Sequence, residues 1–231
     1  MLKATDIGKV YKSHGMESLA LQHVNFQIEK GEYVALLGPG GSGKTTLLKI
    51  AGLILPYTSG TLWFLDKDVT NLSEAQRLAL RRGNISFLQT DPMLVDTLTV
   101  CENIEMPLVY LNYTKKQRRK MVDEQLDFLK IAYLSNSFPF QLTHFQKHLV
   151  SMARATASHP LMVLADKPTN QLNSIETEDY LNVMEQFNAQ GVALVHGTDL
   201  AWMASRAERS INLFDGHVVL DIHAEKNSVN E

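Results

Sequence analysis

Short apolar runs alternate along this chain with segments of helical character. Residues 24–28 alternate apolar and polar side chains, whereas residues 33–37, 161–165 and 192–195 are unbroken apolar runs. Alternation is typical of a half-buried strand, and an unbroken short run is typical of a strand covered on both faces. The same signals predict strands over 2–11, 20–28, 61–65 and 85–88, and a closing hairpin over 210–222.

Helices are predicted between these strands. A capping box at Ser73 opens a helix that ends near Arg82, residues 114–131 form an amphipathic helix, and Asn173 caps a helix that stops at Gly191. Buried strands alternating with helices predict an α/β fold built on a parallel sheet. The polar tail from about Ala224 is expected to fray.

One loop between an apolar run and a predicted helix carries the clearest chemistry. Its residues fit G-x-x-x-x-G-K-[ST] at every fixed position: Gly38-Pro39-Gly40-Gly41-Ser42-Gly43-Lys44-Thr45-Thr46. Glycines let such a loop wrap a polyphosphate, with its N–H groups and the helix N-terminus facing the anion. Lys44 adds a positive charge, and Thr45 places a hydroxyl on Mg²⁺. A glycine-rich turn that binds nothing is disfavoured by the strand–loop–helix context, so the sequence predicts a nucleoside triphosphate site.

Composition limits the partners. The chain has 231 residues, 45% of them hydrophobic, which is enough for one sizeable core or two small lobes. Its net charge of −3 supplies no general attraction for nucleic acid, and we expect no nucleic-acid partner. The basic stretch 115–120 is interpreted as a solvated helix face.

The sequence contains no signal peptide and no apolar run of the roughly 18 residues that a membrane span needs. With Cys101 as the single cysteine, an intrachain disulfide is excluded and a cytosolic setting fits. We therefore expect that any role at a membrane depends on a partner that crosses it.

Further motifs follow the phosphate loop in a fixed order. Tyr11 precedes a variable segment, Gln89 follows a short strand, residues 98–108 read L-T-V-C-E-N-I-E-M-P-L, and residues 165–173 read A-D-K-P-T-N-Q-L-N. Together they resemble the nucleotide-binding subunit of ATP-binding-cassette (ABC) transporters over about residues 2–222. The branch with L-T-x-x-E-N-[VI]-x-x-P-L and A-D-E-P-T-G-N-L-D contains the lipoprotein-release ATPase and the MacB-type exporters.

The resemblance implies a P-loop NTPase fold: a RecA-like parallel sheet, an antiparallel β subdomain and a helical subdomain near 90–160, in one domain over 1–231. Tyr11 would stack on adenine, Gln89 would reach Mg²⁺ and sense the transmembrane partner, and Asp166 would hold Mg²⁺ through water. The expected cofactors are ATP and Mg²⁺.

The resemblance also implies partners. One is a transmembrane permease with a periplasmic domain, docked near residues 89–106 at the cytoplasmic face of the membrane. The other is a second ATP-binding subunit, because hydrolysis in this family uses a composite site between two chains. A homodimer is favoured over a heterodimer, and machines of this branch move periplasmic parts mechanically.

One departure concerns the catalytic carboxylate. The residue after Asp166, where the family has a glutamate that polarises the attacking water, is Lys167. A lysine side chain, whose reference pKa is about 10.4, is protonated at neutral pH and cannot accept that proton. It can pair with the γ-phosphate, which favours holding ATP over splitting it.

A second departure concerns the signature L-S-G-G-Q, which contacts the partner's ATP. The matching residues are Leu142, Thr143, His144, Phe145 and Gln146. Two side chains thus replace two glycines whose bare backbone approaches the γ-phosphate, and a ring there should obstruct that approach. In a homodimer both composite sites would be affected.

The switch histidine of the family can be aligned in two ways. Alignment from the strand favours His196, and alignment from Glu208-Arg209 places Asp199 there with two extra residues. We take His196 as the switch candidate, although a lone histidine beside a strand end is usually structural.

The leading hypothesis is an ABC transporter ATP-binding subunit of the lipoprotein-release/MacB branch with weak or absent hydrolysis. Its ATPase activity is left open, since slow turnover without an activated base is common. The alternative is a non-hydrolysing, ATP-gated scaffold of a membrane complex. A small-molecule or nucleotide kinase would leave Gln89 and the two motif runs unexplained.

Overall fold

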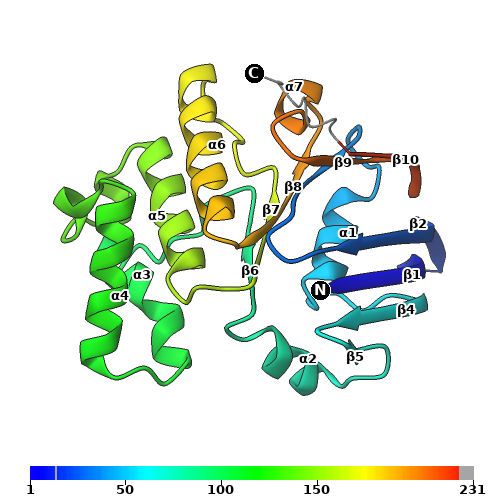
Figure 1. Cartoon of the computed structure of the whole chain (residues 1–231), viewed down its shortest axis with the longest axis horizontal. Helices are drawn as coiled ribbons and strands as arrows, with labels where there is room; N and C mark the ends of the chain where they lie inside the picture. Colours follow the sequence, from blue (N-terminus) through cyan, green and yellow to red (C-terminus); the bar gives the residue numbers. More distant parts are fainter. Residues whose placement is uncertain (14, 224–231) are drawn as a thin grey trace, which may run out of the picture.

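The computed structural model describes residues 1–13 and 15–223, so the predicted tail from Ala224 lies outside the described residues (Figure 1). In chain order the strands are β1 (Leu2–Ser13), β2 (Met16–Ile28), β3 (Tyr33–Leu37), β4 (Ser59–Phe64), β5 (Lys67–Asp68), β6 (Ile85–Leu88), β7 (Met162–Asp166), β8 (Ala193–Thr198), β9 (Arg209–Phe214) and β10 (His217–His223). The α-helices are α1 (Lys44–Ala51), α2 (Glu74–Arg81), α3 (Val100–Tyr110), α4 (Lys115–Phe128), α5 (His144–Thr156), α6 (Ser174–Ala189) and α7 (Ala201–Ala204).

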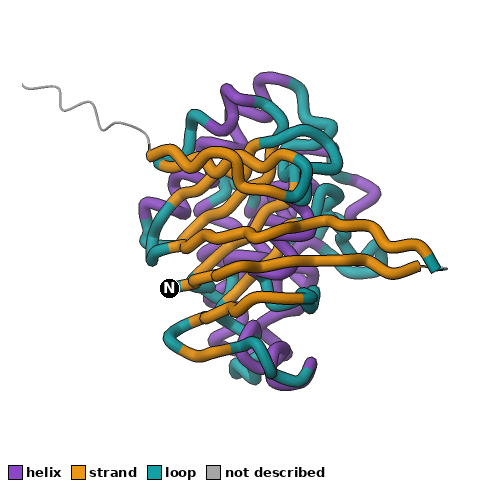
Figure 2. The backbone as a smooth tube through the Cα atoms, turned by 90° about the vertical axis from the view of Figure 1, so that its right-hand side faces the viewer, coloured by secondary structure: helices purple, strands orange, loops and turns teal. Residues whose placement is uncertain are grey.

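Two sheets form the frame, and Figure 2 shows their strands lying one above another. The larger has the order β10-β9-β3-β8-β7-β6, and its neighbours from β9 to β6 are parallel. The smaller is antiparallel, with the order β2-β1-β4-β5. This confirms the predicted α/β fold with its parallel core and antiparallel β part.

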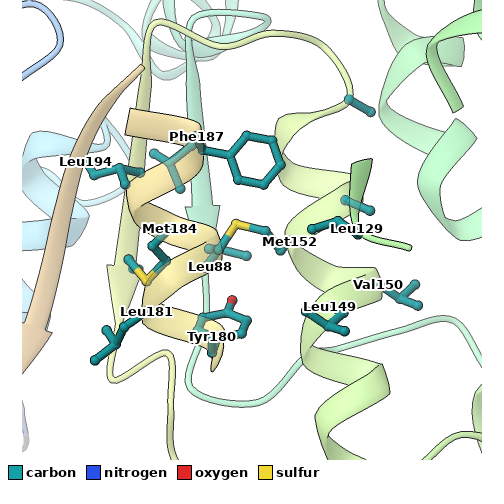
Figure 3. Packing of buried hydrophobic residues seen from close by; sticks show 14 of the residues in the cluster. Leu88, Leu129, Leu149, Val150, Met152, Tyr180, Leu181, Met184, Phe187 and Leu194 are labelled. Carbon is teal, nitrogen blue, oxygen red and sulfur yellow. The ribbon is translucent and has the colours of Figure 1, made fainter. Parts of the chain in front are cut away.

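The apolar runs predicted as buried strands divide their side chains between two cores. In β3, Tyr33 and Ala35 join a core with α3, α4, α5 and α6, whereas Val34 and Leu36 join a core with α1 and the antiparallel sheet. Figure 3 shows Tyr180, Met184 and other side chains of the first core between α6 and its neighbours. Because both faces are covered, unbroken apolar runs rather than alternating ones mark these strands.

The helices α3, α4 and α5 lie between β6 and β7 in the chain and side by side in space (Figure 1). Threonines cap them in the same way: Thr99, Thr114 and Thr143 each accept a hydrogen bond from the backbone N–H three residues later, where Glu or Gln bonds back. Reciprocal bonds of this kind satisfy backbone groups that a helix start leaves without partners. Among the described residues, no helix is both long enough and apolar enough to cross a membrane.

His196, the predicted switch residue, lies inside β8 rather than at its end. Its side chain is fully buried, its ring centroid is 5.3 Å from that of Tyr33, and neither ring nitrogen has a hydrogen-bond partner. Successive strand residues face opposite sides of a sheet, and it is the next residue, Gly197, that faces Lys44 and Asp166. His196 therefore belongs to the core on the other side of the sheet.

We expect His196 to make the fold sensitive to acid. Burial lowers the pKa of His196 to about 4, whereas an unfolded histidine titrates near 6.5, so stability is complete above about pH 6.5 and falls toward pH 4. In urea unfolding at pH 7 and pH 5, His196→Leu should lose about 2 kcal/mol less stability over this interval than the unaltered chain. The exposed His159, replaced by Asn, is the control, and an equal acid loss in His196→Leu would refute the assignment.

Candidate nucleotide-binding site

The phosphate loop joins β3 to α1 at the carboxyl edge of the parallel sheet. Gly43 caps α1 with φ +102°, in the left-handed region that favours glycine, and a Cβ there would lie 2.7 Å from the Ala20 carbonyl oxygen. A Cβ at Gly38 would collide with the Leu213 carbonyl oxygen. The glycines at these two positions are thus required by close contacts with neighbouring strands.

Lys44 is folded against this loop. Its side chain is buried, with the residue 4% exposed, and its ammonium donates to the carbonyl oxygens of Gly38 at 2.7 Å and Pro39 at 2.8 Å, and to Ser42 Oγ at 3.3 Å. Burial, and then the nearby Lys167, lower the pKa of Lys44. A phosphate oxygen that took the place of one of these neutral carbonyl oxygens would give the Lys44 ammonium a negatively charged partner.

Asp166, the last residue of β7, meets the phosphate loop through a hydroxyl. Thr45 Oγ1 lies 3.0 Å from Asp166 Oδ1 and 2.8 Å from Oδ2, and donates to this carboxylate. Hydroxyl and carboxylate oxygens are ligands that Mg²⁺ accepts beside nucleotide phosphates, so these two residues fit the predicted Mg²⁺ site.

Gln89 immediately follows β6 and is exposed. The next residue, Thr90, donates its hydroxyl to the Asp166 carbonyl oxygen at 3.0 Å, which fixes the start of this loop to the end of β7. Sequence reasoning missed Thr90, because a threonine after a strand carries no signal of a partner 76 residues away.

Lys167 and Asp199 form an ion pair beside Asp166. Lys167 Nζ lies 3.0 Å from Asp199 Oδ2, and these side chains are 39% and 47% exposed. Both residues line a mostly polar cavity of about 200 Å³ with Thr169, Asn170, Gln171, Gly197, Thr198, Leu200 and Met203. The hydrogen bond from Lys167 lowers the pKa of Asp199. Asp199 was the second residue that alignment offered for the switch position. It directly follows β8 and lines this cavity.

Tyr11, on β1, stands next to the start of α1. Its hydroxyl is 3.3 Å from Thr46 Oγ1, the residue is 41% exposed, and the Lys9 ammonium lies 5.1 Å from its ring centroid. A partly exposed aromatic ring thus stands beside the helix that follows the phosphate loop. Such a ring is suited to stack on the base of a nucleotide.

The predicted signature residues form the start of α5. Thr143 caps the helix in a reciprocal pair with Gln146, whose side-chain amide also reaches the Tyr133 hydroxyl at 3.4 Å. Phe145 packs against the first core. The hydroxyl and amide that the signature retains are thus engaged within this part of the chain.

His144 is tied to its own helix as well. Its Nε2 lies 3.1 Å from Nε2 of His148, a contact that the sequence motif did not predict. Burial, and then His144, lower the pKa of His148 to about 4. The buried His148 is therefore uncharged near neutral pH.

Comparison with known proteins decides the family. The sequence model described as ABC transporter matches residues 21–170. This chain belongs to the ABC transporter family. The matched ABC region contains the phosphate loop, Gln89, the predicted signature residues and Asp166 with Lys167.

Relatives span most of this ABC domain. The uncharacterized ABC transporter ATP-binding protein MJ1508 of Methanocaldococcus jannaschii is 32% identical over 95% of this chain and 98% of its own length. The macrolide export ATP-binding/permease protein MacB of Campylobacter jejuni is 36% identical over 91% of this chain, which spans about a third (33%) of MacB. The ATP-binding cassette MJ0796, solved as a dimer bound to ADP and Pi, superposes with a TM-score of 0.89 at 32% identity, covering 96% of this chain and 98% of that one.

We predict that ATP binding depends on Lys44. Replacing Lys44 with Ala removes the buried ammonium of the phosphate loop, and charged hydrogen bonds are each worth roughly 1.5–3 kcal/mol. Titration of Mg·ATP should therefore show affinity lower by about tenfold to a hundredfold. Lys49→Ala, on the last turn of the same helix, should bind like the unaltered chain, and comparable losses in the two variants would contradict the site.

Proposed function

We propose that this chain is the ATP-binding subunit of a MacB-like or lipoprotein-release export system and that its ATP hydrolysis is impaired. The observation that carries this proposal is Lys167: an ammonium, paired with Asp199, stands directly after Asp166 beside an intact phosphate loop. The phosphate loop with Thr45 and Asp166, which we call the cradle, keeps its groups for holding Mg·ATP. Lys167 beside it carries a positive charge, which cannot activate water as a carboxylate would.

The chemistry of the pair supports slow hydrolysis. A general base contributes roughly 10²–10⁴-fold to a rate, and an ammonium cannot act as one. Asp199 is a carboxylate, but its hydrogen bond from Lys167 lowers its pKa and so weakens it as a base. Both side chains near the expected water position are therefore poorly suited to take a proton.

We further propose that two copies of the chain pair around ATP, as the cassette MJ0796 is dimeric. His144 and Phe145 then stand where bare glycine backbone would approach the partner's γ-phosphate. The contact from His144 to His148 holds one of these rings on the helix. Each composite site would thus combine a complete cradle with an obstructed signature.

The transmembrane partner in this proposal is a permease with a periplasmic domain, docked from the cytoplasmic face of the membrane. The relatives named MacB carry a permease in the same chain, and this chain spans about a third of their length. In this reading residues 1–231 are one domain with a helical subdomain near 90–160, and Gln89, which leads into that part, senses the partner.

A shallow groove near this segment fits the docking role. Its lining combines β6, α3 and α5, encloses about 250 Å³ and is mostly apolar: Ser86, Phe87, Met106, Pro107, Tyr110, Ser151, Arg154 and Ala155. Tyr110 is 64% exposed at its rim. An exposed aromatic beside an apolar groove is typical of an interface anchor.

We expect Tyr110→Ser to weaken association with the permease. Aromatic anchors contribute about 2 kcal/mol or more to binding, so the affinity for the permease should fall by roughly thirtyfold. Copurification with the permease should show this loss. Val109→Ser removes a neighbouring exposed side chain that does not line the groove and is the matched control. Equal binding by both variants would exclude the groove as the docking site.

Placing a carboxylate after Asp166 should raise the rate of hydrolysis even with the signature residues unchanged. A single Lys167→Glu change would face the new carboxylate with Asp199, so we pair it with Asp199→His. We expect phosphate release by K167E/D199H, with the membrane partner, to exceed that of the unaltered chain by about 10²-fold. Fast release by the unaltered chain, dependent on Lys44, would refute impaired hydrolysis.

The second candidate, an ATP-gated scaffold, is favoured by the same intact cradle beside Lys167. It requires binding without turnover. It therefore predicts that Lys44→Ala abolishes assembly of the membrane complex, while K167E/D199H gives no gain in transport. A transporter that needs turnover predicts no loss, or a gain, in that variant.

A further inference from the structure

We propose that Lys167 and Asp199 form a sensor for the terminal phosphate of ATP, in which that phosphate competes with the Asp199 carboxylate for the Lys167 ammonium. The inference rests on the proposed function only in that the chain binds ATP at its phosphate loop. It concerns the discrimination of ATP from ADP, not the rate of hydrolysis. Asp199 is a positioning residue here, since it acts on the nucleotide through Lys167.

Strand order places the pair beside the phosphates. The strand β8 lies between β3, which leads into the phosphate loop, and β7, which ends at Asp166. Asp166 and Gly197 are register partners, so Lys167 and Asp199 leave adjacent strands at the same edge. The cavity that they line lies at this edge of the sheet.

The pair is also within electrostatic reach of the cradle. Burial, and then the charge of Lys167, lower the pKa of Lys44, while Asp199 and Asp166 raise it. Gly197 lines the same cavity as Lys167 and Asp199, and a Cβ on Gly197 would lie 3.8 Å from Cβ of Lys44. A phosphate that binds at Lys44 therefore enters the field of both members of the pair.

The side chains can exchange partners while the backbone stays fixed. The N–H of Lys167, whose φ is +47°, donates to the Gly197 carbonyl oxygen at 3.1 Å, and the N–H of Leu200 donates to Thr198 Oγ1 at 3.1 Å. Exposed ion pairs are weak, and a lysine has a long flexible stem. Moving the ammonium from Asp199 to a phosphate thus costs little.

Charge decides which partner wins. Lys44 and Lys167 balance Asp166 and Asp199, so the four groups are neutral as a set when the site holds no nucleotide. A γ-phosphate carries more negative charge than a carboxylate and takes the ammonium from it. ADP has no phosphate at that position and leaves the pair intact. Without Lys167, Asp199 would repel the γ-phosphate, and the preference for ATP would fall.

The test compares binding of a non-hydrolysable ATP analogue and of ADP, both with Mg²⁺, by calorimetric titration. We expect Lys167→Met to weaken analogue binding by about tenfold or more and ADP binding by about twofold at most. Asp199→Asn should strengthen analogue binding severalfold, because the competing carboxylate is gone. K167M/D199N should recover only part of the loss, because it lacks the repelling charge but also lacks the ammonium that the γ-phosphate would bind.

A matched control is Lys120→Met, which removes another exposed ion pair, with Glu124 at 3.6 Å on α4. It should change neither affinity. Equal losses of analogue and ADP affinity in Lys167→Met would overturn the sensor, as would a failure of Asp199→Asn to improve analogue binding. Phosphate release is measured separately, so rapid turnover would refute impaired hydrolysis without touching this result.

Discussion

The placement of β8 between β3 and β7 is the constraint on which the site depends. Parallel neighbours end at one edge, so the phosphate loop, Asp166 and Asp199 meet there although they are far apart in the chain. The register also fixes which side chains can take part. Gly197 faces the cradle, and His196, one position earlier, faces the opposite core. A single step along one strand therefore separates a site residue from a core residue.

The site combines a phosphate loop with an ion pair that stands beside it. Lys44 is bonded to carbonyl oxygens of the phosphate loop, and Thr45 is bonded to Asp166. Lys167 and Asp199 neutralise each other beside these groups. In the function proposed above, binding and chemistry are carried by separate groups, so that binding can persist when the chemistry is altered.

Most of the frame could be predicted from sequence because local patterns determine it. Unbroken apolar runs predicted β3, β7 and β8, and Ser73 and Asn173 marked helix starts that the structure confirms. The helix α3 was read only as a motif, since Pro107 interrupts its pattern. The hairpin of β1 and β2 extends further than its apolar positions indicated, because backbone pairing continues beyond the buried part.

The site was predictable where residues are contiguous and not where it depends on register. The glycine-rich loop is recognisable by itself, as is Asp166 at the end of an apolar run. The orientation of His196 depends on the strand face, and alignment alone could not settle it. Likewise, the pairing of Lys167 with Asp199 joins positions 32 residues apart, and only the sheet brings them together.

The bond from the Thr90 hydroxyl to the Asp166 carbonyl oxygen has a mechanical consequence. Thr90 belongs to the segment between β6 and α3, and these two elements supply walls of the apolar groove. A movement of the Asp166 end of β7 is thus passed to the groove through one hydrogen bond and a short stretch of backbone. Such a linkage couples the nucleotide site to the groove and the groove to the nucleotide site, and it does not itself require ATP hydrolysis. Nucleotide binding can therefore affect a partner that is bound in the groove, even when the ATP is not hydrolysed.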